Sequence, residues 1–146
     1  MKRALVISLL LISLGSAWAQ DFIGMNERGV RKIMSEEHPG LAPDEKVRND
    51  TFRYLKYSSG NENETWVIFF DEKGKCSGVR ITCDNSFLDS KRKELDTLYK
   101  PAEKDSWTHR SGGDEISIRL KDETWFFTIT YQRTSKQGKS GNDRTA

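Results

Sequence analysis

Two short runs of β-branched and aromatic residues stand out from the polar remainder of this chain. Residues 64–70 form the most apolar run outside the N-terminus, and residues 123–127 begin with the same Glu-Thr-Trp triplet 59 positions later. Runs of this length with turn residues nearby are typical of buried strands. In residues 64–70 both alternating sets of side chains are apolar, which predicts a strand covered on both faces or an inner strand of a strongly curved sheet.

Further strands are predicted where apolar and polar residues alternate between clusters of turn residues. The clearest case is the run in which Ile116, Ile118 and Leu120 alternate with Ser117 and Arg119. The other predicted strands cover residues 51–58, residues 76–83, a stretch starting at Trp107, and residues 124–131, where Trp125, Phe127, Ile129 and Tyr131 would share the core face.

Two helices are predicted from apolar residues spaced at i, i+3 and i+4. The first begins after Asn26, a good N-cap residue, and ends at Pro39-Gly40, which leads into a polar connection over residues 41–50. Its apolar face carries Val30, Ile33 and Met34. The second follows possible capping residues at 84–86, stops at Pro101, and carries Leu88, Leu95, Leu98 and Tyr99.

The order of these elements is helix, about three strands, helix, about three strands. It predicts the α+β class, with an antiparallel sheet of about five to six strands and both helices packed on one face. The repeated triplet and the two similar helical stripes suggest an internal α-β-β-β duplication. We expect one domain over residues 20–133, which suits a chain of 146 residues.

Residues 1–19 have the features of a secretory signal peptide. Lys2 and Arg3 provide the positive start, an apolar run continues to Leu14, and Ala17-Trp18-Ala19 fits the cleavage pattern of small residues. The apolar run is shorter than the about 20 residues that span a bilayer. We therefore expect a periplasmic or secreted bacterial protein, cleaved near Ala19/Gln20, with no membrane span afterwards. Residues 134–146 are almost entirely polar and predict a disordered tail.

Charge argues against a nucleic-acid partner. The chain has 24 Lys and Arg against 22 Asp and Glu, and loss of Lys2 and Arg3 with the signal leaves 22 of each sign. The two signs are interspersed along the mature chain, so the sequence predicts no basic stripe of the kind that follows a phosphate backbone.

The two cysteines, Cys76 and Cys83, would be exported to an oxidising compartment, where disulfides form. If they lie on one strand, seven steps of about 3.3 Å separate them by roughly 23 Å. A disulfide needs Cα atoms within about 7 Å, so a Cys76–Cys83 bridge would require a turn at Ser77-Gly78. Two thiols are also too few for a zinc site, and we expect no metal and no cofactor.

The start of the domain resembles a known group of small envelope proteins. Ile23-Gly24-Met25-Asn26, the first helix and Pro39, and the hairpin Phe70-Asp71-Glu72-Lys73-Gly74-Lys75 are similar to outer-membrane assembly lipoproteins of the SmpA/OmlA type and to β-lactamase-inhibitor-like (BLIP-like) proteins. The chain departs from that pattern in having His38 before the proline and in lacking the lipoprotein cysteine. The resemblance implies a binding module. The chain also looks like small secreted proteins of unknown function from Bacteroides-type bacteria.

Candidate binding residues are aromatic. Trp107 with Tyr57 and Phe126 could form an exposed platform for an envelope protein or a glycan, and His109 lies beside it. Trp66 and Trp125 are interpreted as core residues of the two repeated strands.

The main prediction is a soluble, non-enzymatic binding or protein-interaction module that uses the open face of its sheet. One alternative is a secreted enzyme inhibitor of the BLIP-like kind. The other is a small hydrolase, in which His109 would act as a general base with Asp105 or Asp114. The sequence offers that histidine no nucleophile in a Gly-x-Ser-x-Gly setting.

Overall fold

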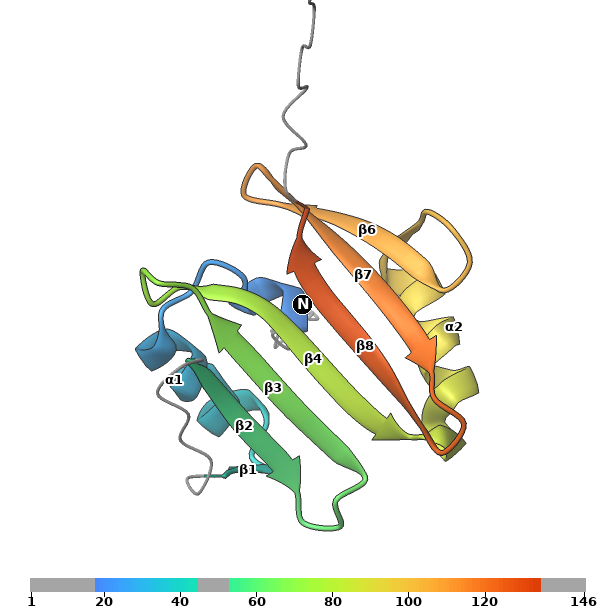
Figure 1. The fold of residues 1–146 in the computed structure, drawn as a ribbon, viewed down its shortest axis with the longest axis horizontal. Coiled ribbons are helices and arrows are strands. Elements are labelled where there is room, and N and C mark those ends of the chain that lie inside the picture. Colours follow the sequence, from blue (N-terminus) through green and yellow to red (C-terminus); the bar gives the residue numbers. More distant parts are fainter. Residues whose placement is uncertain (1–17, 45–52, 135–146) are drawn as a thin grey trace, which may run out of the picture.

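The computed structural model describes residues 18–44 and 53–134, which form one antiparallel sheet backed by two helices (Figure 1). Residues 1–17, 45–52 and 135–146 lie outside the described residues. These ranges contain nearly all of the predicted signal and tail, and part of the predicted polar connection. The α+β class and the antiparallel sheet are therefore as the sequence predicts.

The sheet has eight strands in the order β1-β2-β3-β4-β8-β7-β6-β5, and every neighbouring pair is antiparallel. The prediction of five to six strands was thus too low. The strands are β1 (Leu41–Pro43), β2 (Tyr54–Ser59), β3 (Glu64–Phe70), β4 (Cys76–Asp84), β5 (Lys100–Pro101), β6 (Ser106–Ser111), β7 (Asp114–Asp122) and β8 (Phe126–Arg133).

The two strands that the pattern missed, β1 and β5, are the edges of the sheet. They have three and two residues, and each follows a helix and ends in a proline, Pro43 or Pro101. Proline has no backbone N–H and cannot donate a hydrogen bond to a neighbouring strand, so it is tolerated at the edge of a sheet. At an edge it also disfavours pairing with the strands of other chains. Runs this short show no alternation, and Pro101 reads in the sequence only as a helix stop.

Both predicted helices are present, as α1 (Glu27–Glu37) and α2 (Leu88–Leu98), with short 3-10 turns η1 (Ala19–Phe22) and η2 (Asn85–Phe87). The side chain of Asn26 caps α1 by accepting a hydrogen bond of 2.8 Å from the Gly29 backbone N–H. Asp84 accepts a similar bond from the Ser86 N–H and so starts η2, which runs directly into α2.

Both helices lie behind the same face of the sheet in Figure 1, and the core is formed there. Because strand side chains alternate with a period of two, one set from every long strand points at the helices. The fully enclosed members include Ile68 of β3, Val79 of β4, Ile118 of β7 and Phe127 of β8. Phe22 of η1, Val30 and Met34 of α1, and Leu95 of α2 complete this core.

Cys76 and Cys83 lie on the single strand β4 as buried free thiols, seven residues apart. Their side chains join the helix-covered face, so both sulfurs are out of water. Burial raises the pKa of the Cys76 thiol from 9.0 to about 11 and that of the Cys83 thiol to about 12. Both thiols therefore stay protonated in the folded protein at neutral pH.

We expect the free energy of unfolding to fall as the pH rises from about 8 to about 10. The thiols ionise near their ordinary pKa in the unfolded chain but stay protonated in the folded chain, so the unfolded state binds fewer protons. Each thiol contributes a loss of about 1 kcal/mol over this range. Urea unfolding at both pH values should show a smaller loss of unfolding free energy for Cys76→Ala/Cys83→Ala than for the wild type. Equal losses in the two proteins would contradict a raised pKa of the two thiols.

Candidate functional site

The second face of the sheet has no described helix over it (Figure 1). Its side chains are half-buried or exposed, in contrast to the buried set on the helix-covered face. We call this surface the open face. Its side chains are Tyr54, Lys56 and Ser58 of β2, Thr65, Val67 and Phe69 of β3, Arg80 and Thr82 of β4, Thr128, Thr130 and Gln132 of β8, Ser117, Arg119 and Lys121 of β7, and Ser106, Thr108 and Arg110 of β6.

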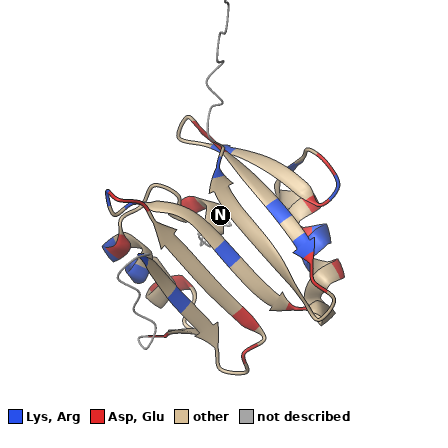
Figure 2. Cartoon of the chain, viewed as in Figure 1, with Lys and Arg blue, Asp and Glu red and all other residues tan. Residues whose placement is uncertain are grey.

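A row of cations crosses the middle of the open face. The strand register places Lys56, Val67, Arg80, Thr130 and Arg119 side by side across five neighbouring strands. Figure 2 shows the corresponding basic bands on β2, β4 and β7. Lys56 is paired with Asp44 of the edge segment, with Nζ and Oδ2 3.3 Å apart. The row therefore brings basic groups of separate strands onto one surface.

Arg80 and Arg119 are the unusual members of this row. Both are exposed, and neither forms an ion pair or a side-chain hydrogen bond with any residue in the described ranges. They flank the single strand β8, so the strand spacing separates their backbones by about 10 Å. Two guanidinium groups held this way can each offer a planar fork of donors to a carboxylate.

The rest of the open face offers hydroxyl groups and a small apolar area. Thr65, Thr82 and Thr128 lie on adjacent strands, so their hydroxyls form a second row parallel to the cations. At one side Tyr54 and Phe69 pack with ring centroids 6.4 Å apart. This mixture of aromatic area, hydroxyls and arginine is typical of surfaces that bind other molecules.

The predicted aromatic platform does not form. Tyr57 and Trp107 point to the helix-covered face, where they are only 4% and 2% exposed. The indole Nε1–H of Trp107 donates a 2.9 Å hydrogen bond to Asp96 of α2, which fixes the ring inside the core. Phe126 alone of the three is exposed, at the start of β8. The three rings are therefore not one surface.

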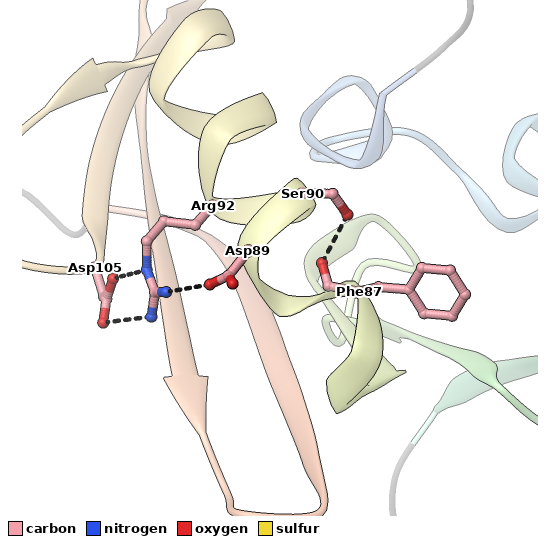
Figure 3. Close-up of polar contacts among 5 residues, drawn as sticks. All are labelled: Phe87, Asp89, Ser90, Arg92 and Asp105. Carbon is pink, nitrogen blue, oxygen red and sulfur yellow. Dashed lines mark hydrogen bonds and ion pairs between the residues drawn. The ribbon is translucent and has the colours of Figure 1, made fainter.

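The two carboxylates proposed to assist His109 in hydrolysis are engaged elsewhere. His109 is half-buried on β6 with its ring centroid 5.5 Å from that of Tyr99, and its side chain has no hydrogen bond or ion pair within the described ranges. Asp105 is held by Arg92 of α2, with Nε and Oδ1 2.8 Å apart (Figure 3). Asp114 pairs with Arg133 at 3.1 Å. Each carboxylate is thus neutralised by an arginine instead of serving the histidine.

Three exposed aromatic residues lie in the elements near the end of the sheet where β4 ends and β8 begins. Trp125, Phe126 and Phe87 are 84%, 42% and 47% exposed, and we call this region the aromatic corner. The ring of Phe87 points away from α2 in Figure 3. Asn85 donates a 2.9 Å hydrogen bond to the Thr124 carbonyl and so ties η2 to the β7–β8 turn.

Trp125 was predicted to lie in the core, and this was wrong because the hairpin turn is longer than expected. The Glu123 N–H donates to the Phe126 carbonyl and the Trp125 N–H to the Glu123 carbonyl, so Trp125 belongs to the turn. Thr124 has a φ of 76°, which is rare for a β-branched residue. No sequence signal marks such a turn, because glycine or asparagine is normally expected there.

The described ranges contain no cluster of three His, Cys, Asp or Glu residues able to hold a metal ion. Neither described helix has the length and apolar character needed to cross a membrane. Comparison of the chain with models of protein families, with curated proteins and with solved structures found no match in any of the three. The functional argument therefore depends on the surfaces of the molecule itself.

Truncation of Trp107 should destabilise the protein strongly, whereas truncation of Trp125 should leave its stability nearly unchanged. Trp107→Ala should lower the free energy of unfolding by about 3–5 kcal/mol, because it empties a core position and leaves Asp96 unpaired. Trp125→Ala should change it by no more than about 0.5 kcal/mol, because that ring is in solvent. Urea unfolding followed by circular dichroism measures both, independently of tryptophan fluorescence. Similar costs for the two variants would contradict this placement.

Proposed function

We propose that this protein is a non-enzymatic binding module of the bacterial envelope, periplasmic or secreted, and that it holds its partner on the open face. The observation that carries this proposal is the pair Arg80 and Arg119, exposed and without an ion-pair partner among the described residues. Structural arginines are usually paired, as Arg92 is with Asp105. Two unpaired guanidiniums amid hydroxyls and half-buried apolar side chains favour a role in recognition.

The chemistry of the open face indicates what the partner carries. Among the described residues, Asp44 pairs with Lys56 at the edge of this face, and Asp84 and Glu115 lie toward strand ends, so no carboxylate is paired with Arg80 or Arg119. The complementary group is a carboxylate, presented either by an acidic protein surface or by an acidic glycan. The predicted signal peptide supports an envelope location for both kinds of partner.

A secreted enzyme inhibitor is the second candidate, and the aromatic corner is the observation that favours it. Trp125 is 84% exposed on a turn held by backbone hydrogen bonds and by Asn85. A rigid projecting indole can enter the cleft of an enzyme at little conformational cost. The resemblance to BLIP-like proteins is consistent with this alternative.

We also infer that the two halves of the domain are repeats. Each half has an 11-residue helix followed by four strands, and the strand order of one half mirrors that of the other about the β4–β8 pair. The repeated Glu-Thr-Trp triplet does not support the duplication, because residues 64–66 open β3 whereas residues 123–125 precede β8. The topology alone favours two copies of one α-β unit.

The binding proposal is tested by capture from an envelope extract on the immobilised protein. Arg80→Ala/Arg119→Ala should weaken capture of the partner that the wild-type protein binds at least about tenfold, because both guanidinium groups are lost. The matched control is Arg28→Ala/Lys32→Ala, which removes two exposed cations from α1 and should leave capture unchanged.

Three outcomes of this experiment are informative. Retention of the partner by the open-face variant would overturn the proposal. Capture that survives protease treatment of the extract would identify a glycan, and capture that is abolished would identify a protein. Loss of capture in Trp125→Ala, with the open-face variant unaffected, would favour the inhibitor alternative.

A further inference from the structure

The helix-covered side of the molecule contains a cavity that the open face does not explain. It has a volume of about 180 Å³ and lies between α2, the segment at Trp18 and Ala19, and the middle of the sheet. Its floor is formed by Trp66 of β3, Ile81 of β4 and Ile129 of β8. These three strands are neighbours at the centre of the sheet, so the floor is a rigid surface.

Part of the cavity wall is apolar. Leu95 and Leu98 of α2 form one side, and Ala19 closes part of the other. Leu95 and Ala19 are each only 2% exposed, whereas Leu98 and Trp18 are 40% and 38% exposed. Five large apolar side chains are exposed in the described ranges, and two of them, Trp18 and Leu98, border this cavity. Their exposure indicates a mouth through which a small molecule can enter.

The charged residues of the lining set the preferred charge of an occupant. Lys91 and Glu94 form an ion pair, with Nζ and Oε2 3.0 Å apart. Glu64 is the second carboxylate, and it accepts a hydrogen bond from the indole Nε1–H of Trp66. His38, whose ring centroid is 4.9 Å from that of Trp66, and Tyr131 complete the polar part of the lining. Two carboxylates stand against the one ammonium group of Lys91, so this part of the lining favours a neutral or cationic molecule over an anionic one.

We propose that this cavity is a binding site for a small apolar molecule of about the size of one aromatic ring, either neutral or carrying an amine. Its volume exceeds the about 150 Å³ of an apolar cavity known to bind benzene. The amine would lie toward Glu64, and the apolar body would fill the space between Leu95 and Ile129. The site is on the opposite side of the sheet from Arg80 and Arg119, so it is independent of the proposed open-face function.

Trp18 and Ala19 connect this site to export. Both belong to the predicted signal peptide, and cleavage after Ala19 would remove one wall of the cavity. Gln20, whose side chain accepts a 2.5 Å hydrogen bond from the Tyr99 hydroxyl, would then become the first residue. The processed chain should therefore accept larger apolar molecules than the full-length chain.

The test is thermal unfolding of the full-length chain and of the exported form with benzene, benzylamine and benzoate as matched probes. Benzene and benzylamine should raise the melting temperature by at least about 2 °C at saturation, because a ligand of the folded state stabilises it. Benzoate should give a smaller rise. No saturable rise with any probe in either form would overturn the proposal, and the largest rise with benzoate would overturn the charge preference.

Variants of α2 test the location of the site. Leu98→Trp should block the mouth and abolish the rise in melting temperature, whereas Thr97→Trp, at the next and exposed position, should preserve it. Ile81→Phe should fill the cavity and also abolish the rise, with less destabilisation than Ile118→Phe, which overpacks an enclosed position outside the cavity. Full ligand response in both Leu98→Trp and Ile81→Phe would exclude this cavity as the site.

Discussion

The pairing of β4 with β8 is the interaction on which the rest of the structure depends. It joins two halves of the chain through an unbroken register from Gly78 opposite Gln132 to Asp84 opposite Phe126. Without this pairing, each half would be a sheet of four strands with one helix, and its hydrophobic core would be too small to keep it folded alone. With it, Val79 and Ile81 of β4 lie beside Tyr131 and Ile129 of β8, and the two helices close over a shared core.

The period of two along these central strands gives the molecule two surfaces with different chemistry. Trp66, Ile81 and Ile129 point to the cavity under α2, and the residues next to them, Val67, Arg80 and Thr130, point to the open face. The same three strands therefore contribute residues to both candidate sites, and β7 adds Arg119 to the open face. One face is buried because α1 and α2 cover it, and the other is polar because nothing in the described chain covers it.

Much of the fold could be predicted because its signals are local. Asn26 identifies the start of α1, and the alternation of Ile116, Ile118 and Leu120 identifies β7. The edge strands β1 and β5 were missed because two or three residues have no periodicity, and their pairing depends on neighbours distant in sequence. The total of eight strands, and the junction at β4 and β8, are properties of the assembled sheet that no single run encodes.

The candidate sites were harder to predict, because they depend on which face of a strand is covered. Trp107 lies opposite Ile118 on the helix-covered face, and its indole donates a hydrogen bond to Asp96, which is on a helix eleven residues earlier. For Trp125, the outcome depends on a turn in which Thr124 adopts a φ of 76°. Strain at a β-branched residue persists only where the surroundings enforce it, here through Asn85 and the hydrogen bonds of the turn. An indole kept in solvent by a strained turn contributes little to the core, and this exposure is the feature on which the inhibitor alternative depends.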